Sequence, residues 1–83
     1  MSEKAAYQLR ALAVDSGLMV ATLPSPSPKH LRFNVNVGHR RSHDDWLLVD
    51  LSNQGLTVEA SLSGKPQRIS FDEATKLIKK VAR

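Results

Sequence analysis

The sequence contains no cysteine, which excludes disulfide bonds, thiolate metal ligands and a cysteine nucleophile. Stability must therefore come from packing, and we expect a reducing, cytoplasmic compartment. Long hydrophobic runs are missing too, because the apolar run near the start, residues 18–23, is far too short to span a bilayer. Aromatic side chains are scarce, with one Trp, one Tyr and two Phe, so few are available to stack on nucleic-acid bases.

What the chain does contain fits one small globular domain over residues 1–83. Hydrophobic residues make up 41% and charged residues 24%, and a chain of 83 residues cannot build a second core. Twelve Lys and Arg against eight Asp and Glu leave a net charge of +4, which favours polyanions without requiring them. No cofactor motif is visible, so we expect no cofactor. Such a size and composition are typical of a bacterial or phage accessory protein.

Helical periodicity predicts a helix over residues 3–16, with Ser2 as its N-terminal cap and Gly17 just beyond its last turn. This helix has apolar residues on two sides, which indicates that one side packs on the domain and the other needs a further partner. The first side holds Ala5, Leu9, Leu12, Ala13 and Ser16, and the second holds Tyr7, Ala11 and Val14.

A second helix is predicted at the end of the chain. Ser70 and Glu73 have the spacing of a capping box, in which each side chain bonds the other residue's backbone N–H. The residues that follow form one apolar stripe at helical spacing. Its members are Phe71, Ala74, Leu77, Ile78, Val81 and Ala82.

Between the helices, alternating apolar and polar residues predict five strands. The first covers 18–23 and ends at the proline-rich segment 24–28, which lacks backbone donors. Three more cover 31–37, 45–51 and 56–62, and a short fifth strand precedes the second helix. The order α-β-β-β-β-β-α predicts an α+β domain, in which an antiparallel meander carries both helices on one face.

Two turns set the expected register of the last strands. A four-residue loop over 52–55 pairs Leu51 with Leu56. A type II′ turn at Gly64-Lys65 pairs Leu62 with Gln67 and, by the same register, Ala60 with Ile69. The residues expected to share one core are Leu47, Val49, Leu51, Leu56, Val58, Leu77, Ile78 and Val81.

The sheet face opposite the helices is expected to be open and mostly polar, yet it carries Trp46 and Leu48. Such a small apolar cluster on a polar face is typical of a binding surface. We therefore expect a non-enzymatic interaction module that binds a protein partner or a second copy of itself, through this face or through the second helix strip. The expected contact residues on the face are Trp46, Leu48, Arg32, Asn34 and Asn36.

An alternative is a nucleic-acid-binding protein that uses a basic loop and the last helix. Their cations would contact phosphates, and affinity would fall steeply with salt. The same cations also suit a plain helix, because positive charge near a helix C-terminus complements the dipole. The residues of this alternative are Lys29, Arg40, Arg41, Lys76 and Lys80.

Histidines concentrate in the loop between the second and third strands, where His39 and His43 flank Arg40 and Arg41. Two His with a carboxylate suit zinc, and two His suit acid–base chemistry on a phosphodiester. Spacing of i, i+4 gathers ligands on one side only in a helix, however, and the arginines would repel a metal. We therefore expect no metal and no catalytic residue in this solvated loop.

A further alternative depends on a resemblance. His30 and Phe33 form a His-x-x-aromatic pair near the second strand, and helices bracket the strands. This is similar to the small HicA-type toxin ribonucleases, which share the fold plan of double-stranded-RNA-binding domains. The resemblance implies RNA cleavage, and this alternative is a small hydrolase or nuclease centred on His30, His39 and His43.

Overall fold

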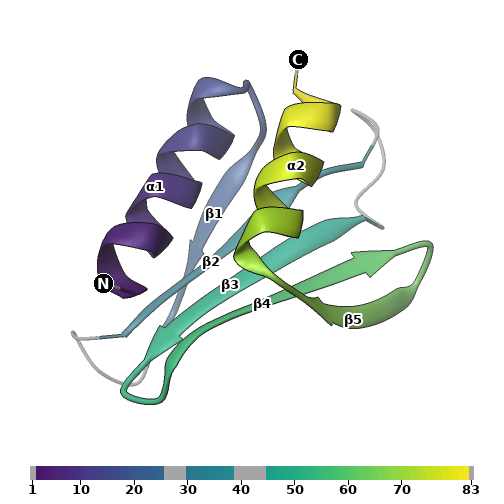
Figure 1. Ribbon diagram of the computed structural model, residues 1–83. Helices are drawn as coiled ribbons and strands as arrows, with labels where there is room; N and C mark the ends of the chain where they lie inside the picture. Colours follow the sequence, from purple (N-terminus) through teal and green to yellow (C-terminus); the bar gives the residue numbers. More distant parts are fainter. Residues whose placement is uncertain (1, 26–29, 39–44, 83) are drawn as a thin grey trace.

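The computed structural model describes residues 2–25, 30–38 and 45–82 of the chain. Its five strands form one sheet in sequence order, each antiparallel to the next, and both helices lie on one face of that sheet (Figure 1). This confirms the predicted α+β meander. The elements are α1 (Ser2–Asp15), β1 (Val20–Leu23), β2 (Leu31–Asn36), β3 (Trp46–Ser52), β4 (Gly55–Leu62), β5 (Lys65–Ile69) and α2 (Phe71–Val81).

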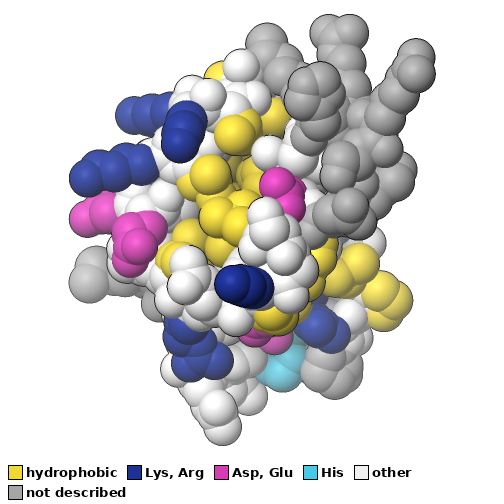
Figure 2. Space-filling model, turned by 90° about the vertical axis from the view of Figure 1, so that its right-hand side faces the viewer, with side chains coloured by type: hydrophobic (Ala, Val, Ile, Leu, Met, Phe, Trp, Pro, Cys, Tyr) yellow, Lys and Arg dark blue, Asp and Glu magenta, His cyan; other side chains and the backbone are white. Residues whose placement is uncertain are grey.

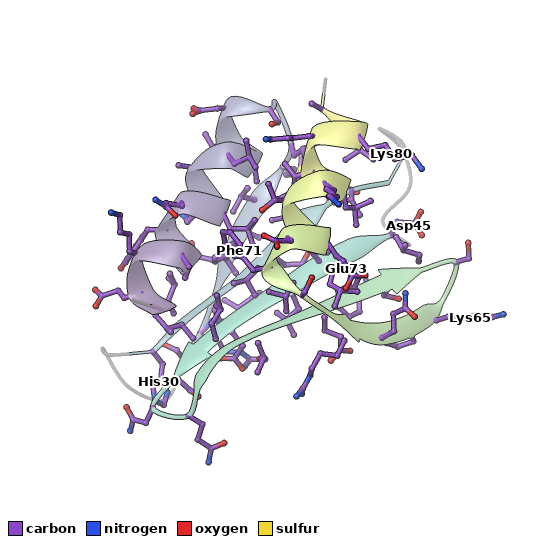
Figure 3. The ribbon with its side chains drawn as sticks, in the orientation of Figure 1. His30, Asp45, Lys65, Phe71, Glu73 and Lys80 are labelled. Carbon is purple, nitrogen blue, oxygen red and sulfur yellow. The ribbon has the colours of Figure 1, made fainter. Side chains whose placement is uncertain are left out.

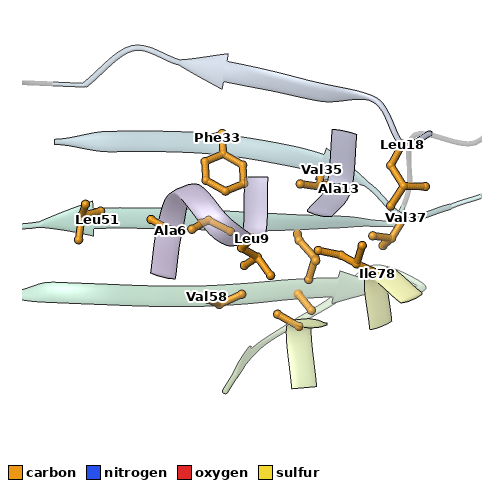
Figure 4. Packing of buried hydrophobic residues seen from close by; sticks show 14 residues of the cluster. Ala6, Leu9, Ala13, Leu18, Phe33, Val35, Val37, Leu51, Val58 and Ile78 are labelled. Atoms are coloured by element: carbon orange, nitrogen blue, oxygen red, sulfur yellow. The ribbon is translucent and has the colours of Figure 1, made fainter. Parts of the chain in front are cut away.

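The core lies between the helices and the three central strands. Figure 4 shows how Ala6 and Leu9 of α1 lie over Phe33 and Val58 of the sheet, with Ile78 of α2 beside them. Of the expected core residues, five are buried and three are partly buried against the same cluster. The buried ones are Leu47, Val49, Leu51, Val58 and Ile78, and the partly buried ones are Leu56, Leu77 and Val81.

Local signals in the sequence explain where the helices begin and end. Ser70 Oγ accepts a hydrogen bond from Glu73 N at 3.1 Å, and Ser70 N donates to Glu73 Oε1 at 3.2 Å, so the capping box forms. At the end of α1, Gly17 has φ 79°, a conformation that glycine adopts without steric cost. The helix itself runs from Ser2 to Asp15, one residue earlier than predicted at each end.

The β3–β4 register is as predicted, because Leu51 pairs with Leu56 and Val49 with Val58. The connection is tighter than the predicted four-residue loop, since Ser52 and Gly55 also pair. The ladder therefore continues one step further than the sequence indicated.

The predicted β4–β5 register is wrong. Leu62 pairs with Lys65 and Ala60 with Gln67, so Ile69 lies opposite Val58 and not Ala60. The turn residues are Ser63 at φ 55° and Gly64 at φ 78°, two positive values in succession, which is the type I′ pattern. The side chain of Asp45 supports this turn by accepting a hydrogen bond from Ser63 N at 2.9 Å. The shift is two residues, so every β5 side chain keeps its predicted face.

Strand β5 forms one edge of the sheet, and all of its residues except Ile69 are exposed. Lys65 and Gln67 share the helix-side face with Leu62, yet both are exposed because α2 does not reach over them. Figure 2 shows hydrophobic side chains in the gap between the basic side of α2 and this hairpin. None of the helices described here is long and apolar enough to cross a membrane.

Candidate interaction surface

The open face of the sheet is the side that carries neither helix, and strand pairing arranges its side chains in rows. Trp46 lies beside Asn36 on β2 and Ser61 on β4. One step along the strands, Leu48 lies beside Asn34 and Glu59. Alternate residues of a strand share a face. Leu47, Val49 and Leu51 of β3 therefore enter the core, whereas Trp46 and Leu48 lie on the open face.

The sheet extends the Trp46 row at both ends. Met19 precedes β1, and its carbonyl accepts a hydrogen bond from Asn36 N at 3.0 Å, which continues the β1–β2 register by one residue. On the far side Pro66 of β5 pairs with Ser61. Met19 is 68% exposed, Trp46 is half-buried, and Ser61 between Trp46 and Pro66 is buried. One end of the open face therefore carries a row across all five strands in which Met19, Trp46 and Pro66 alternate with the polar residues Asn36 and Ser61.

Sequence reasoning missed Met19 and Pro66 as members of this surface. Their place depends on how the two edge strands pair with the sheet, which periodicity within a single strand does not reveal. The sequence offered one signal that the open face continues onto the first strand. Within residues 18–23, Ala21 and Leu23 are apolar at positions where a solvated strand face is usually polar. Both pair with open-face residues of β2, namely Asn34 and Arg32.

The charges on the open face balance. Arg32 Nε lies 3.5 Å from Asp50 Oδ2 across the β2–β3 ladder, and each side chain is about a third exposed. Glu59 of β4 pairs with Arg68 of β5. Two cations therefore face two anions among the described residues of this face, which gives a phosphate backbone no net attraction.

Of the cations of the nucleic-acid alternative, the structure describes two, which lie on the same helix. Lys76 and Lys80 are exposed on α2, together with Lys79, and Asp72 and Glu73 share the same short helix. The other predicted members, Lys29, Arg40 and Arg41, lie outside the described residues.

The histidines give no catalytic arrangement in the described structure. His30 precedes β2, and Figure 3 places it far from Lys80, at the opposite end of the molecule. Its Nε2 is shielded from solvent and has no hydrogen-bond partner among the described residues. Phe33, the second residue of the ribonuclease resemblance, is fully buried in the core. The loop residues His39 and His43 lie outside the described part of the chain.

Within residues 2–25, 30–38 and 45–82, no group of three His, Asp or Glu side chains is arranged to hold a metal ion. The feature that remains is the row that holds Met19, Trp46 and Pro66 on a charge-balanced sheet face. Comparison with protein-family models, with curated proteins and with solved structures finds no match to this chain. The surface must therefore be interpreted from its own geometry.

Proposed function

We propose that the protein is a non-enzymatic interaction module that binds a partner protein through the open face of its sheet. The observation that carries the proposal is the row of Met19, Trp46 and Pro66, with Leu48 beside it, on a face that neither helix covers. Tryptophan and methionine are enriched at protein–protein interfaces, and a large aromatic anchor commonly supplies much of the binding free energy.

Charge indicates the chemistry of the partner. The open face pairs Arg32 with Asp50 and places Arg68 opposite Glu59, so its described charges cancel. A polyanion would gain little from such a face, whereas an apolar side chain surrounded by neutral polar groups would fit it. Neutral polar residues lie among the apolar ones, because Asn36 stands between Met19 and Trp46 and Asn34 stands beside Leu48. The expected partner therefore presents an apolar surface with a polar, uncharged margin.

Trp46 is the chain's one tryptophan, so intrinsic tryptophan fluorescence reports on the proposed binding surface. The proposal can therefore be tested without an added fluorescent label. A photo-crosslinking residue at position 48 should capture the partner from cells, whereas the same residue at position 79, exposed on α2, should not. The captured protein, once purified, should shift Trp46 emission to shorter wavelength on titration. Leu48→Asp should weaken that binding at least about tenfold, because it buries an unpaired charge.

Lys79→Asp serves as the matched control, because it also changes one exposed position to Asp but on the opposite side of the molecule. Equal binding by wild type and Leu48→Asp would contradict the proposal. So would tight, strongly salt-dependent binding of RNA or DNA with no shift in Trp46 emission, which would move the function to the basic residues.

A further inference from the structure

The outer side of α1 carries an apolar strip that nothing in the described structure covers. Tyr7, Ala11 and Val14 recur at i, i+4 and i+7, and Tyr7 and Val14 are 51% and 53% exposed. The opposite side of the same helix holds Leu9 and Ala13, which are buried against the sheet. Helix α1 is therefore apolar on two opposite sides, and only one of them is used within the monomer.

A shallow depression lies over the first half of this strip. It is lined by Glu3, Lys4, Tyr7, Gln8 and Ala11. The last four stand at i, i+3, i+4 and i+7, which is the set of residues that forms the hole for one knob in knobs-into-holes helix packing. The depression thus has the geometry that a side chain from a second, facing helix fills.

We propose that the chain pairs with a second copy of itself through α1, with the two helices antiparallel and the two-fold axis near Ala11. The centre of the depression lies about one turn before Ala11, and Val14 lies about one turn after it. In the antiparallel pair, Val14 of each copy therefore inserts into the depression of the other. The small Ala11 side chains meet at the crossing point and let the helices approach closely.

Charge complementarity is compatible with the antiparallel orientation. Lys4 and Asp15 are exposed at opposite ends of the strip and on the same flank of it. Antiparallel pairing places Lys4 of each copy on the same flank as Asp15 of the other, with an offset along the helix axis of about one turn, 5.4 Å, and it does so twice. In a parallel pair like positions lie level, so each depression would face the other depression and not Val14. On the other flank Arg10 faces its own copy, which opposes the pair and gives a further test.

Pairing through α1 has a consequence for binding. Because both helices lie on one face of the sheet, the two open faces of the pair point outward (Figure 1). The pair would offer two copies of the surface in the proposed function and gain avidity for a partner that presents two sites. This consequence rests on the proposed function, whereas the pairing itself does not.

Sedimentation equilibrium of the full chain over a range of concentrations tests the proposal. Wild type should show a monomer–dimer equilibrium. Lys4→Asp and Asp15→Lys should each weaken it about three- to tenfold, because each replaces two attractive contacts by repulsive ones. The double variant should recover wild-type affinity, and a mixture of the two single variants should form mixed dimers.

Three further variants separate this interface from others. Val14→Asp should abolish the dimer, and Arg10→Gln should tighten it by removing like charges near the axis. Leu48→Asp on the open face should leave the dimer unchanged, which distinguishes failure of the pairing from failure of the proposed function. All these positions are solvent-accessible, and circular dichroism verifies that each variant is folded.

A wild-type chain that stays monomeric up to about millimolar concentration would overturn the proposal. A dimer that survives Val14→Asp, or one whose charge-swapped double variant stays weak, would do the same. A dimer lost in Leu48→Asp would assign self-association to the open face instead.

Discussion

The two faces of one sheet behave differently in this protein, and adjacent leucines of β3 show the difference. Leu47 is 0% exposed beneath the helices, whereas its neighbour Leu48 is half-buried on the face without helices. The covered face is apolar along the central strands, and the open face mixes apolar residues with paired charges. Packing therefore constrains the side chains of the covered face, whereas it places few constraints on those of the open face.

This contrast separates stability from binding. A side chain on the covered face cannot change without leaving a cavity or causing a clash, because protein interiors are close-packed. A side chain on the open face meets water in the monomer, so its replacement acts mainly on whatever docks there. The predictions below test that separation, from the largest expected effect to the smallest.

The largest effect is expected from Leu47→Ala, compared with Leu48→Ala as a matched control. Leu47→Ala should lower the free energy of unfolding by about 2–5 kcal/mol, because it leaves a cavity in the core. Leu48→Ala should cost below about 1 kcal/mol, because its side chain is only half-buried. Urea denaturation of both variants gives the difference. Similar losses would mean that the open face is covered in the free protein.

Helix α2 covers part of the buried face, and its N-terminal cap should contribute an intermediate effect. Ser70→Ala removes the acceptor for Glu73 N and should lower the free energy of unfolding by about 1 kcal/mol. Ser70→Asp keeps an acceptor at the cap and should stay close to wild type in thermal unfolding at neutral pH. A large loss in Ser70→Asp would show that the hydroxyl has a role besides capping.

The smallest effect is expected on the open face, at Arg32 and Asp50. Their ion pair is partly solvated, so a double-mutant cycle with Arg32→Gln and Asp50→Asn should give a coupling of about 0–1 kcal/mol that declines as salt rises. Chemical denaturation at low and high salt measures it. A coupling energy well above this range that does not change with salt would mean that the pair is shielded from solvent. The open face would then be covered in the free protein.

Much of this fold is local in origin. The alternation in residues 31–37 and 45–51 placed Phe33, Leu47 and Val49 on the buried face, and the capping box placed the start of α2 at Phe71. The β4–β5 turn escaped prediction, because Ser63 adopts a positive φ that is unusual for a residue with a side chain. The hydrogen bond from Ser63 N to Asp45 comes from a residue 18 positions away, which local patterns do not reveal.

The candidate surface was predictable only in its centre. Trp46 and Leu48 followed from alternation within β3, because one strand contains all the information needed to assign its faces. Met19 and Pro66 lie on different edge strands, and only the pairing of five strands brings them into the same row.

By itself the sequence determined the elements, their faces and the core, because helical and strand periodicity sort side chains within about ten residues of one another. It also indicated the second apolar strip of α1. Only the tertiary structure decided that Met19, Trp46 and Pro66 share one row across the sheet and that the charges around it cancel. Those properties arise between strands, where the register of distant segments sets which side chains become neighbours.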